Sequence, residues 1–416
     1  MNAFSWIFVV ALAAATATRI WLAQRQMRHV RAHRDAVPRT FADAIPLTAH
    51  QKAADYTVAK ARLGVVDVLV GAAALLALTL GGLLQWISDL WSGSFESGSL
   101  VHGVALIVSV VVLLSALELP LTVVRTFVIE ARFGFNRMSV ALFIADLARQ
   151  VLLAALLGVP LLLLVLWLMG RMGEWWWFYV WLAWMGFNLL VLLLYPTFIA
   201  PLFNRFTPLE HPELAGRIES LLGRCGFKAK GLFVMDGSKR SSHGNAYFSG
   251  FGAAKRIVFF DTLLSRLAPA EVEAVLAHEL GHFKRHHVWK RVGVLFALSL
   301  FFLWVLGQLI GREWFYAGLG VATQTTATAL LLFVLAMPVF TFFLQPVTSL
   351  VSRRHEFEAD AYAAAHAGAP QLVKALVKLY QDNAATLTPD PLHSAFYDSH
   401  PPAATRIARL QQTAAL

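Results

Sequence analysis

The sequence predicts a mainly α-helical, polytopic membrane protein with seven transmembrane helices and a cytoplasmic domain that contains a small β-sheet. Of the 416 residues, 58% are hydrophobic and only 14% are charged, whereas a soluble domain carries about 25% charged residues. The apolar residues gather in long runs, and two more hydrophilic blocks lie in the second half of the chain. This composition is typical of a protein that crosses a bilayer several times.

Seven apolar runs are long enough to cross a membrane, because a spanning helix needs roughly 20 predominantly apolar residues. The predicted spans are Ala3–Leu22, Val65–Trp86, Val101–Leu121, Val140–Leu168, Trp176–Phe198, Val292–Ile310 and Thr326–Phe343. The first run could be a signal peptide. Its positive charges follow the apolar residues instead of preceding them, so we interpret it as an uncleaved anchor.

Basic residues beside the spans predict the orientation. Arginines follow the first, third and seventh spans, and many basic residues follow the fifth, whereas the loops after the even-numbered spans are nearly free of them. Positively charged loops stay on the cytoplasmic side, so the amino terminus should lie outside and the carboxyl terminus inside. The alanine- and leucine-rich spans favour a bacterial inner membrane; in a eukaryotic host the expected site is the endoplasmic reticulum membrane.

The net charge of +10 could indicate a nucleic-acid partner. The basic residues cluster beside the spans, however, where they set topology and meet anionic lipid headgroups. We therefore expect membrane lipids and no nucleic acid as partners. The single cysteine, Cys225, excludes an internal disulfide framework and a metal site built from several thiolates.

The pattern of spans divides the chain into four segments. Residues 1–203 carry the first five spans, residues 204–291 form one hydrophilic block, residues 292–344 carry the last two spans, and residues 345–416 form the second block. Both blocks fall on the same side and could pack as one domain. In the first block, "KGLFVMDG", "NAYFSGFG" and "RIVFFDTLL" are bounded by glycine or polar residues and predict short strands.

The next stretch, "SRLAPAEVEAVLAHELGHFKRHH", predicts a helix with Pro269 in its first turn. His278 and His282 are four residues apart, so they share a helix face and can both bind one zinc ion. Glu279 is displaced by one residue, near enough to act on a water molecule at the metal without being a ligand. This HExxH pattern is typical of zinc proteases, so the two blocks are predicted to form a zinc metalloprotease domain with one Zn²⁺.

A catalytic zinc ion usually has three protein ligands, so a third must lie elsewhere. The residues after His282 lack the metzincin continuation. His286 and His287 follow too closely to be good ligands, and His287 is expected to support the helix or the lipid interface.

The second block offers candidates in "SRRHEFEADAYAAAHAG", which predicts another helix. Glu356 and Asp360 share a face of it, so one can bind zinc while the other supports a histidine. Glu358 points elsewhere and is expected to face solvent. Four histidines remain as rival ligands, namely His355, His366, His393 and His400.

Taken together, "HELGH" and "RRHEFEADAYA" resemble the paired motifs of the type I CAAX prenyl proteases, integral-membrane zinc metalloendopeptidases of the gluzincin kind. The resemblance covers almost the whole chain, including "FVIEARFGFN" between two spans. It implies that Glu356 is the third zinc ligand and that Asp360 supports the site without touching the metal.

Two further motifs carry the resemblance. "SSHGNAYFSGFG" implies that Asn245 and Ala246 pair with the backbone of a substrate, although Gly244 stands where many relatives have serine. "SHPPAATRI" implies that His400 and Arg406 face the active site. Both are candidates for stabilising the oxyanion of a tetrahedral intermediate, because positioned positive charge stabilises developing negative charge.

The function that the resemblance implies is endoproteolysis of a peptide or protein, with or without a lipid. The favoured job is removal of the last three residues of a prenylated CAAX protein. A second hypothesis keeps the chemistry but makes the protein a bacterial-type quality-control protease for membrane proteins. A third is a transporter or receptor with structural zinc, which Glu279 argues against because a closed structural site needs no base beside a ligand.

Overall fold

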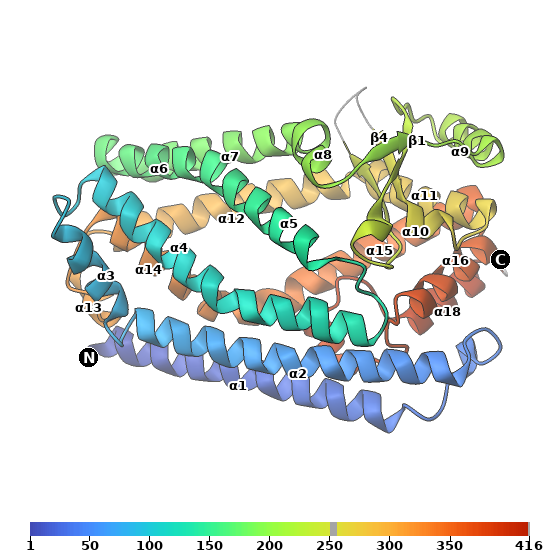
Figure 1. Cartoon of the computed structure of the whole chain (residues 1–416), viewed down its shortest axis with the longest axis horizontal. Helices are drawn as coiled ribbons and strands as arrows, with labels where there is room; N and C mark the ends of the chain where they lie inside the picture. The colour runs from blue at the N-terminus through green and yellow to red at the C-terminus, as the bar shows by residue number, and fades with distance from the viewer. Residues whose placement is uncertain (250–255, 415–416) are drawn as a thin grey trace.

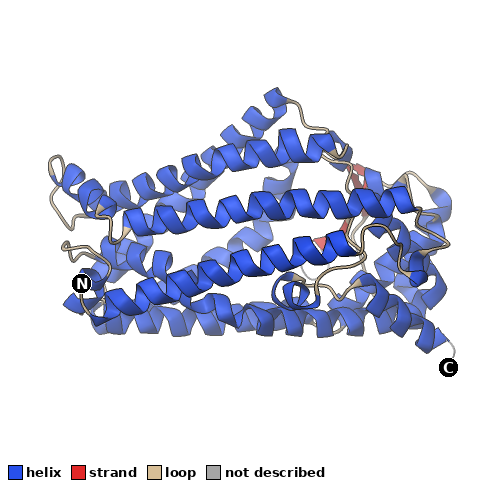
Figure 2. Ribbon diagram, turned by 90° about the horizontal axis from the view of Figure 1, so that it is seen from below, coloured by secondary structure: helices blue, strands red, loops and turns tan. Residues whose placement is uncertain are grey.

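The computed structural model describes residues 1–249 and 256–414 and has the form of an elongated helical bundle. Long helices run side by side along most of its length, and a small sheet with several shorter helices lies at the end that holds the carboxyl terminus (Figure 1). The view from below shows the same division, with the strands confined to that end (Figure 2). The predicted fold class is confirmed.

Among the described residues, seven helices are long and apolar enough to cross a membrane, as predicted. They cover Ala3–Ala32, Leu47–Leu78, Leu100–Glu130, Val140–Arg171, Gly173–Phe203, His287–Leu309 and Thr326–Ala367. Within them lie α1 (Ala3–Ala32), α2 (Leu47–Leu78), α4 (Leu100–Val123), α5 (Val140–Leu153), α6 (Val159–Arg171), α7 (Trp176–Leu194), α8 (Ala200–Phe203), α12 (His287–Leu309), α14 (Thr326–Thr341) and α15 (Gln345–Ala367).

The second span differs most from its predicted bounds, Val65–Trp86. Helix α2 starts at Leu47, well before the apolar run. Its first turns are polar, so a prediction based on apolar residues misses them. It ends at Leu78, and Gly82 then adopts a left-handed conformation (φ 75°) that only glycine takes without strain. Residues up to Trp86 therefore belong to a separate helix, α3 (Leu83–Ser92).

The seventh span continues without a break into the region that follows it. Thr326–Ala367 forms 42 consecutive helical residues, which at 1.5 Å per residue is about 63 Å, roughly twice the hydrocarbon thickness of a bilayer. The apolar α14 together with the apolar turn Phe342–Leu344 that follows it is long enough to account for the span. Helix α15, which carries the charged residues, therefore extends beyond the membrane.

The sheet has four strands in the order β1-β2-β4-β3. The strands are β1 (Phe206–Pro208), β2 (Leu232–Met235), β3 (Ala246–Ser249) and β4 (Arg256–Phe260). Strands β2 and β4 are parallel, whereas β1 and β3 pair antiparallel on the outside. The three predicted strands are present, although the end of the second, from Gly250 on, lies outside the described residues. Strand β1 was not predicted.

The two hydrophilic blocks pack as one unit. Its remaining helices are α9 (Pro212–Arg224), α10 (Asp261–Leu264), α11 (Pro269–Lys284), α16 (Ala369–Asp382), α17 (Pro391–Tyr397) and α18 (Ala403–Ala414), while α13 (Glu313–Gly318) lies between two spans. One hydrophobic core joins residues of the first block, such as Leu280, to residues of the second, such as Leu372. Pro269 opens α11 as predicted, and Glu271 accepts a hydrogen bond from the backbone N–H of Ala268 at 2.8 Å.

The junction between the unit and the membrane helices is polar. Arg240, which precedes β3, donates to both carboxylate oxygens of Asp146 in α5, at 2.7 and 2.9 Å. Asn136, at the end of the "FVIEARFGFN" motif, forms an isolated antiparallel bridge with Ser241. These contacts fix the start of the β3 segment against the spans.

Candidate metal centre

Helices α11 and α15 approach each other closely at Gly281, which lies between the two histidines of "HELGH". A Cβ atom at Gly281 would lie only 2.8 Å from the Cα atom of Ala359, so no larger residue fits without moving a helix. The faces that carry His278 and His282 on one side and Glu356 on the other therefore meet directly. The close approach depends on one small residue.

Three ligand atoms converge between these helices. Nε2 of His278 lies 3.2 Å from Nε2 of His282, and the oxygens of Glu356 lie 3.4 Å from the former and 3.2 Å from the latter. Two atoms that each lie about 2.0–2.1 Å from a tetrahedral zinc ion are about 3.3 Å apart. Oε2 of Glu356 is also buried and has no hydrogen-bond partner among the described residues. The spacing, the donor types and this unpartnered oxygen fit a divalent metal such as zinc.

Asp360 lies behind His278, on the side away from the other ligands. Nδ1 of His278 donates to Oδ1 of Asp360 at 2.9 Å. Burial disfavours the imidazolium, but the hydrogen-bonded Asp360 and the nearby Glu356 carboxylate outweigh this effect and raise the pKa of His278 to about 9 in the metal-free protein.

Arg406 of α18 holds Asp360 in a two-pronged ion pair, in which Nε donates at 2.9 Å and Nη2 at 2.6 Å. The guanidinium is 5% exposed, and its Nη1 lies 3.8 Å from Oε2 of Glu356. The arginine thus faces the site, as the resemblance implies, but its Nε and Nη2 groups are engaged by Asp360.

Glu279 and His400 face a cavity of about 200 Å³ beside the ligands. Burial raises the pKa of the Glu279 carboxyl above its ordinary value, which makes the carboxylate a stronger base. Burial also lowers the pKa of His400. Nε2 of His400 lies 3.4 Å from Oε2 of Glu356, yet its side chain is 58% exposed. Of the two predicted positive groups, His400 is the more accessible.

Strand β3 forms another wall of the same cavity. Gly244, Asn245 and Ala246 line it together with His278 and Glu279. In the part of the chain that the structure describes, β3 has β4 on one side and no strand on the other, and such an edge can pair with an extended peptide. A Cβ atom at Gly244 would make an ordinary contact, 3.4 Å from Leu263 Cα, so the serine of many relatives would fit there.

The edge strand has supports that the sequence did not indicate. Oδ1 of Asn383, after α16, accepts a hydrogen bond from the N–H of Gly244 at 3.2 Å and lies 3.2 Å from Nδ1 of His243. The other ring nitrogen of His243 lies 3.4 Å from a carboxylate oxygen of Glu130, which belongs to the third span. Asn383 is 139 residues from Gly244, so no local pattern marks the contact.

Of the four rival histidines, only His400 lies at the site, and the other three lie elsewhere. His366 binds the carbonyl of Tyr362 within its own helix, and the ring of His393 packs at a tilt of 42° against that of Tyr397. The ring of His355 stacks on that of His287 at 4.0 Å.

Glu358 faces solvent as predicted, with its side chain 46% exposed, but it also has a partner that the sequence did not indicate. Its Oε2 accepts a hydrogen bond from Nε2 of His287 at 3.0 Å. The helix does turn Glu358 away from Glu356, as expected, but α12 begins on that side and brings His287 to it.

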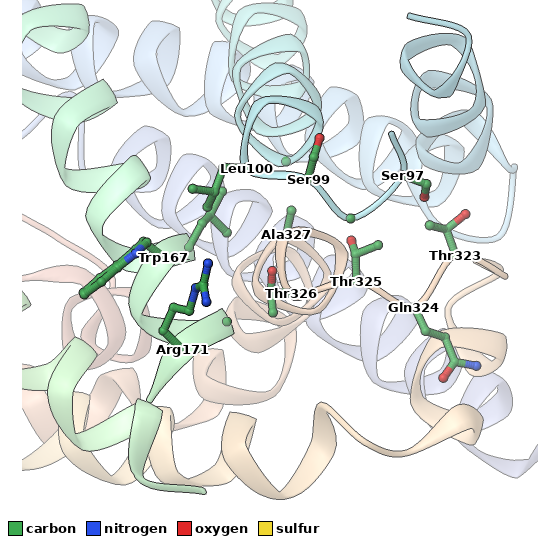
Figure 3. Close-up of a pocket in the computed structure, with 14 residues that line it drawn as sticks. Ser97, Ser99, Leu100, Trp167, Arg171, Thr323, Gln324, Thr325, Thr326 and Ala327 are labelled. Carbon is green, nitrogen blue, oxygen red and sulfur yellow. The ribbon is translucent and has the colours of Figure 1, made fainter. Parts of the chain in front are cut away.

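Another cavity, of about 560 Å³, is lined by residues at the start of α4, the end of α6 and the start of α14, which lie at the end of the bundle opposite the sheet in Figure 1. Figure 3 shows hydroxyl side chains such as Ser99 and Thr325 around it, with Arg171 at one side. Although this cavity is larger, it contains no histidine or carboxylate among its lining residues. The described residues form one group that could hold a metal ion, namely His278, His282 and Glu356.

Two family models cover nearly the whole chain. Residues 26–205 match the model described as CAAX prenyl protease N-terminal, five membrane helices. Residues 208–414 match the model of peptidase family M48.

Similar proteins come from several eukaryotes. The CAAX prenyl protease 1 homolog of Oryza sativa is 38% identical over 324 residues, which is 77% of this chain and 76% of the rice protein. The CAAX prenyl protease 1 of Saccharomyces cerevisiae is 38% identical over 310 residues, 70% of this chain and 68% of the yeast protein. The crystal structure of S. mikatae Ste24p superposes with a TM-score of 0.89 at 30% identity, covering 99% of both chains.

Proposed function

The chain belongs to the CAAX prenyl proteases of peptidase family M48 and is an integral, multi-pass membrane metallopeptidase, and we propose that it uses one zinc ion to remove the carboxyl-terminal tripeptide from prenylated CAAX proteins. One observation carries the proposal. The ligand atoms of His278, His282 and Glu356 converge at zinc-like spacings beside Glu279 and an open strand edge.

The metal would be held by the two histidines and Glu356, whose buried Oε2 is otherwise without a partner among the described residues. Zinc in such a site supplies a Lewis acid that polarises a carbonyl and acidifies water. The remaining chemistry belongs to the side chains around it.

Glu279 is the proposed general base. Its carboxylate takes a proton from the attacking water and then delivers this proton to the leaving amine. Burial raises its pKa, which strengthens it in the first of these roles.

The substrate would bind as an added strand. An extended peptide that pairs with the edge of β3 that has no neighbouring strand among the described residues, at Asn245 and Ala246, receives main-chain hydrogen bonds that are indifferent to its side chains. The same cavity contains His278 and Glu279, so a bond held at this edge lies close to the base. His400, exposed on the other side of Glu356, is the proposed donor to the oxyanion.

Arg406 has a different proposed role from His400. Its paired hydrogen bonds to Asp360 hold that carboxylate against Nδ1 of His278, which keeps the lone pair of Nε2 aimed at the metal. A buried charge in such a pair adds to the positive potential near the oxyanion without touching the substrate.

We also propose that the catalytic unit faces the cytoplasm and that the amino terminus lies outside. The support is the cluster of arginines in the last turns of α1 and just after it, at the same end of the bundle as the sheet. The named relatives are eukaryotic, and the bacterial inner membrane is a prediction from composition alone.

The test uses detergent-purified protein, a farnesylated CAAX peptide and its unlipidated twin. We expect release of the tripeptide from the farnesylated peptide, loss of that release with a chelator, and its recovery with zinc. Glu279→Gln is the inactive control, because glutamine keeps the shape of the side chain but cannot accept the proton of the attacking water. Cleavage of neither peptide, together with degradation of an unfolded membrane protein, would overturn CAAX processing in favour of quality control.

A further inference from the structure

His287 lies directly behind the second histidine of the metal site. Its Nδ1 is 3.0 Å from Nδ1 of His282, and its Nε2 is 3.0 Å from a carboxylate oxygen of Glu358. We propose that Glu358 and His287 form a positioning relay that fixes the ring and the tautomer of His282, and the inference rests on the metal site of the proposed function.

The hydrogen-bond chemistry of the relay allows one arrangement for neutral rings. A carboxylate only accepts, so Nε2 of His287 must carry a hydrogen and donate it to Glu358. Nδ1 of His287 then has a lone pair and accepts the hydrogen on Nδ1 of His282. Nε2 of His282 is left with its own lone pair, which points toward Nε2 of His278 and Glu356. This is the tautomer that a metal ligand needs.

The surroundings of His287 hold its ring in this orientation. The side chain is 1% exposed, and the ring of His355 stacks on it at 4.0 Å with only 12° between the planes. His286 adopts a left-handed conformation (φ 57°), which is uncommon for a residue with a side chain, and α12 begins immediately after it. This turn places His287 against α11.

The relay parallels the support of the first histidine. His278 donates directly to Asp360, whereas His282 reaches Glu358 through one intervening ring. Glu356, Glu358 and Asp360 all belong to α15. One helix therefore supplies a metal ligand and the carboxylates that orient both histidines.

The experiment measures zinc affinity of the detergent-purified, full-length protein by competition with a chromophoric chelator, beside the absorption spectrum of the cobalt-substituted protein. His287→Phe keeps the volume and the stacking on His355 but removes the acceptor. His287→Asn places an amide oxygen near the position of Nδ1. We expect His287→Phe to weaken zinc binding by about 10- to 100-fold and to alter the cobalt bands, and His287→Asn to recover most of both.

Two further variants keep the test decisive. Glu358→Leu removes the last group of the relay at a side chain that is 46% exposed, so it remains informative if His287→Phe fails to fold, and it should also weaken zinc binding. His366→Phe is the matched control, because the ring of His366 stacks on Tyr362 at the same 4.0 Å but forms its hydrogen bond to a carbonyl of its own helix.

Unchanged zinc affinity in folded His287→Phe and Glu358→Leu, with a lower melting temperature, would show that His287 only ties three helices together. Equal losses in His287→Phe and His287→Asn would also overturn the relay. A wild-type protein that binds no zinc would instead overturn the metal site.

Discussion

Two of the cavities of this molecule, the one that His278 and Glu279 line and the one at the far end, differ in size and in what surrounds them. The cavity at the metal centre has a volume of about 200 Å³ and that at the far end about 560 Å³. Only the smaller one contains groups whose polar atoms point at a common centre. A reactive site is therefore better identified by polar atoms that converge without hydrogen-bond partners than by the volume of a cavity.

Two hydroxyl groups of the far cavity, those of Ser99 and Thr325, already accept hydrogen bonds that cap helices. Ser99 accepts from the N–H of His102 at the start of α4, and Thr325 accepts from the N–H of Thr328 at the start of α14, both at 3.2 Å. Such caps satisfy helix N-termini. At the metal centre, by contrast, Oε2 of Glu356 is buried without a hydrogen-bond partner in the residues that the structure describes.

The comparison predicts its largest effect at Glu279. Glu279→Gln should lower kcat by about three orders of magnitude, because general acid–base catalysis contributes about 10²–10⁴-fold. The bound zinc, measured by metal analysis of the purified protein, should stay at the wild-type level. A variant that turns over at a tenth of the wild-type rate or faster would contradict the general-base role.

Gly281→Ala tests how tightly the metal centre is built. The new methyl group would lie 2.8 Å from Ala359 Cα, and overpacking of this kind costs about 1–3 kcal/mol. We expect a lower melting temperature in detergent and weaker zinc binding. Gly293→Ala in α12 is the control, since a Cβ atom there meets nothing within 4 Å; equal effects of both substitutions would refute the close-packing argument.

The pH dependence of zinc binding tests whether Asp360 controls the protonation of His278. The pKa of His278 is raised from 6.5 to about 9, so in the metal-free protein its proton competes with zinc below pH 9. Affinity should rise about tenfold per pH unit between pH 7 and 9 as this one proton is lost. Competition with a chelator of known pH dependence measures the slope, and Asp360→Asn should flatten it.

The smallest effect is expected in the far cavity. Arg171→Gln removes its one cationic side chain among the lining residues, and we expect the rate of peptide cleavage and zinc binding to change by less than twofold. A large loss of activity in a normally folded variant would show that the far cavity takes part in the reaction, and it would contradict the distinction between the two cavities.

The sequence predicted which side chains share a helix face at this site, because these pairings are local in the chain. Four-residue spacing in a helix brings His278 to His282 and Glu356 to Asp360. The resemblance to a family then joined the two pairs, which the residues alone left open. Seven spans were predicted for a similar reason, since apolar length is directly readable.

What escaped prediction depends on contacts between distant segments or on short elements. Strand β1 has three residues and ends in Pro208, which gives no alternating pattern. The polar first turns of α2 lie outside any hydrophobic window. Glu358 contacts His287 because His286 adopts a left-handed conformation. Glycine is the usual sequence signal for that conformation, and it is absent at this position. Such features follow from tertiary packing.

The insertion of two spans between the halves of the catalytic unit has a consequence for biosynthesis. His278 and Arg406 are 128 residues apart, and helices α12 and α14 cross the membrane between them. A growing chain that has already made "HELGH" cannot close the metal centre until both spans are inserted and α15 and α18 have folded back onto α11. Hydrolytic activity is thus acquired late in membrane insertion, so the half-made chain is not yet a protease beside the translocation machinery.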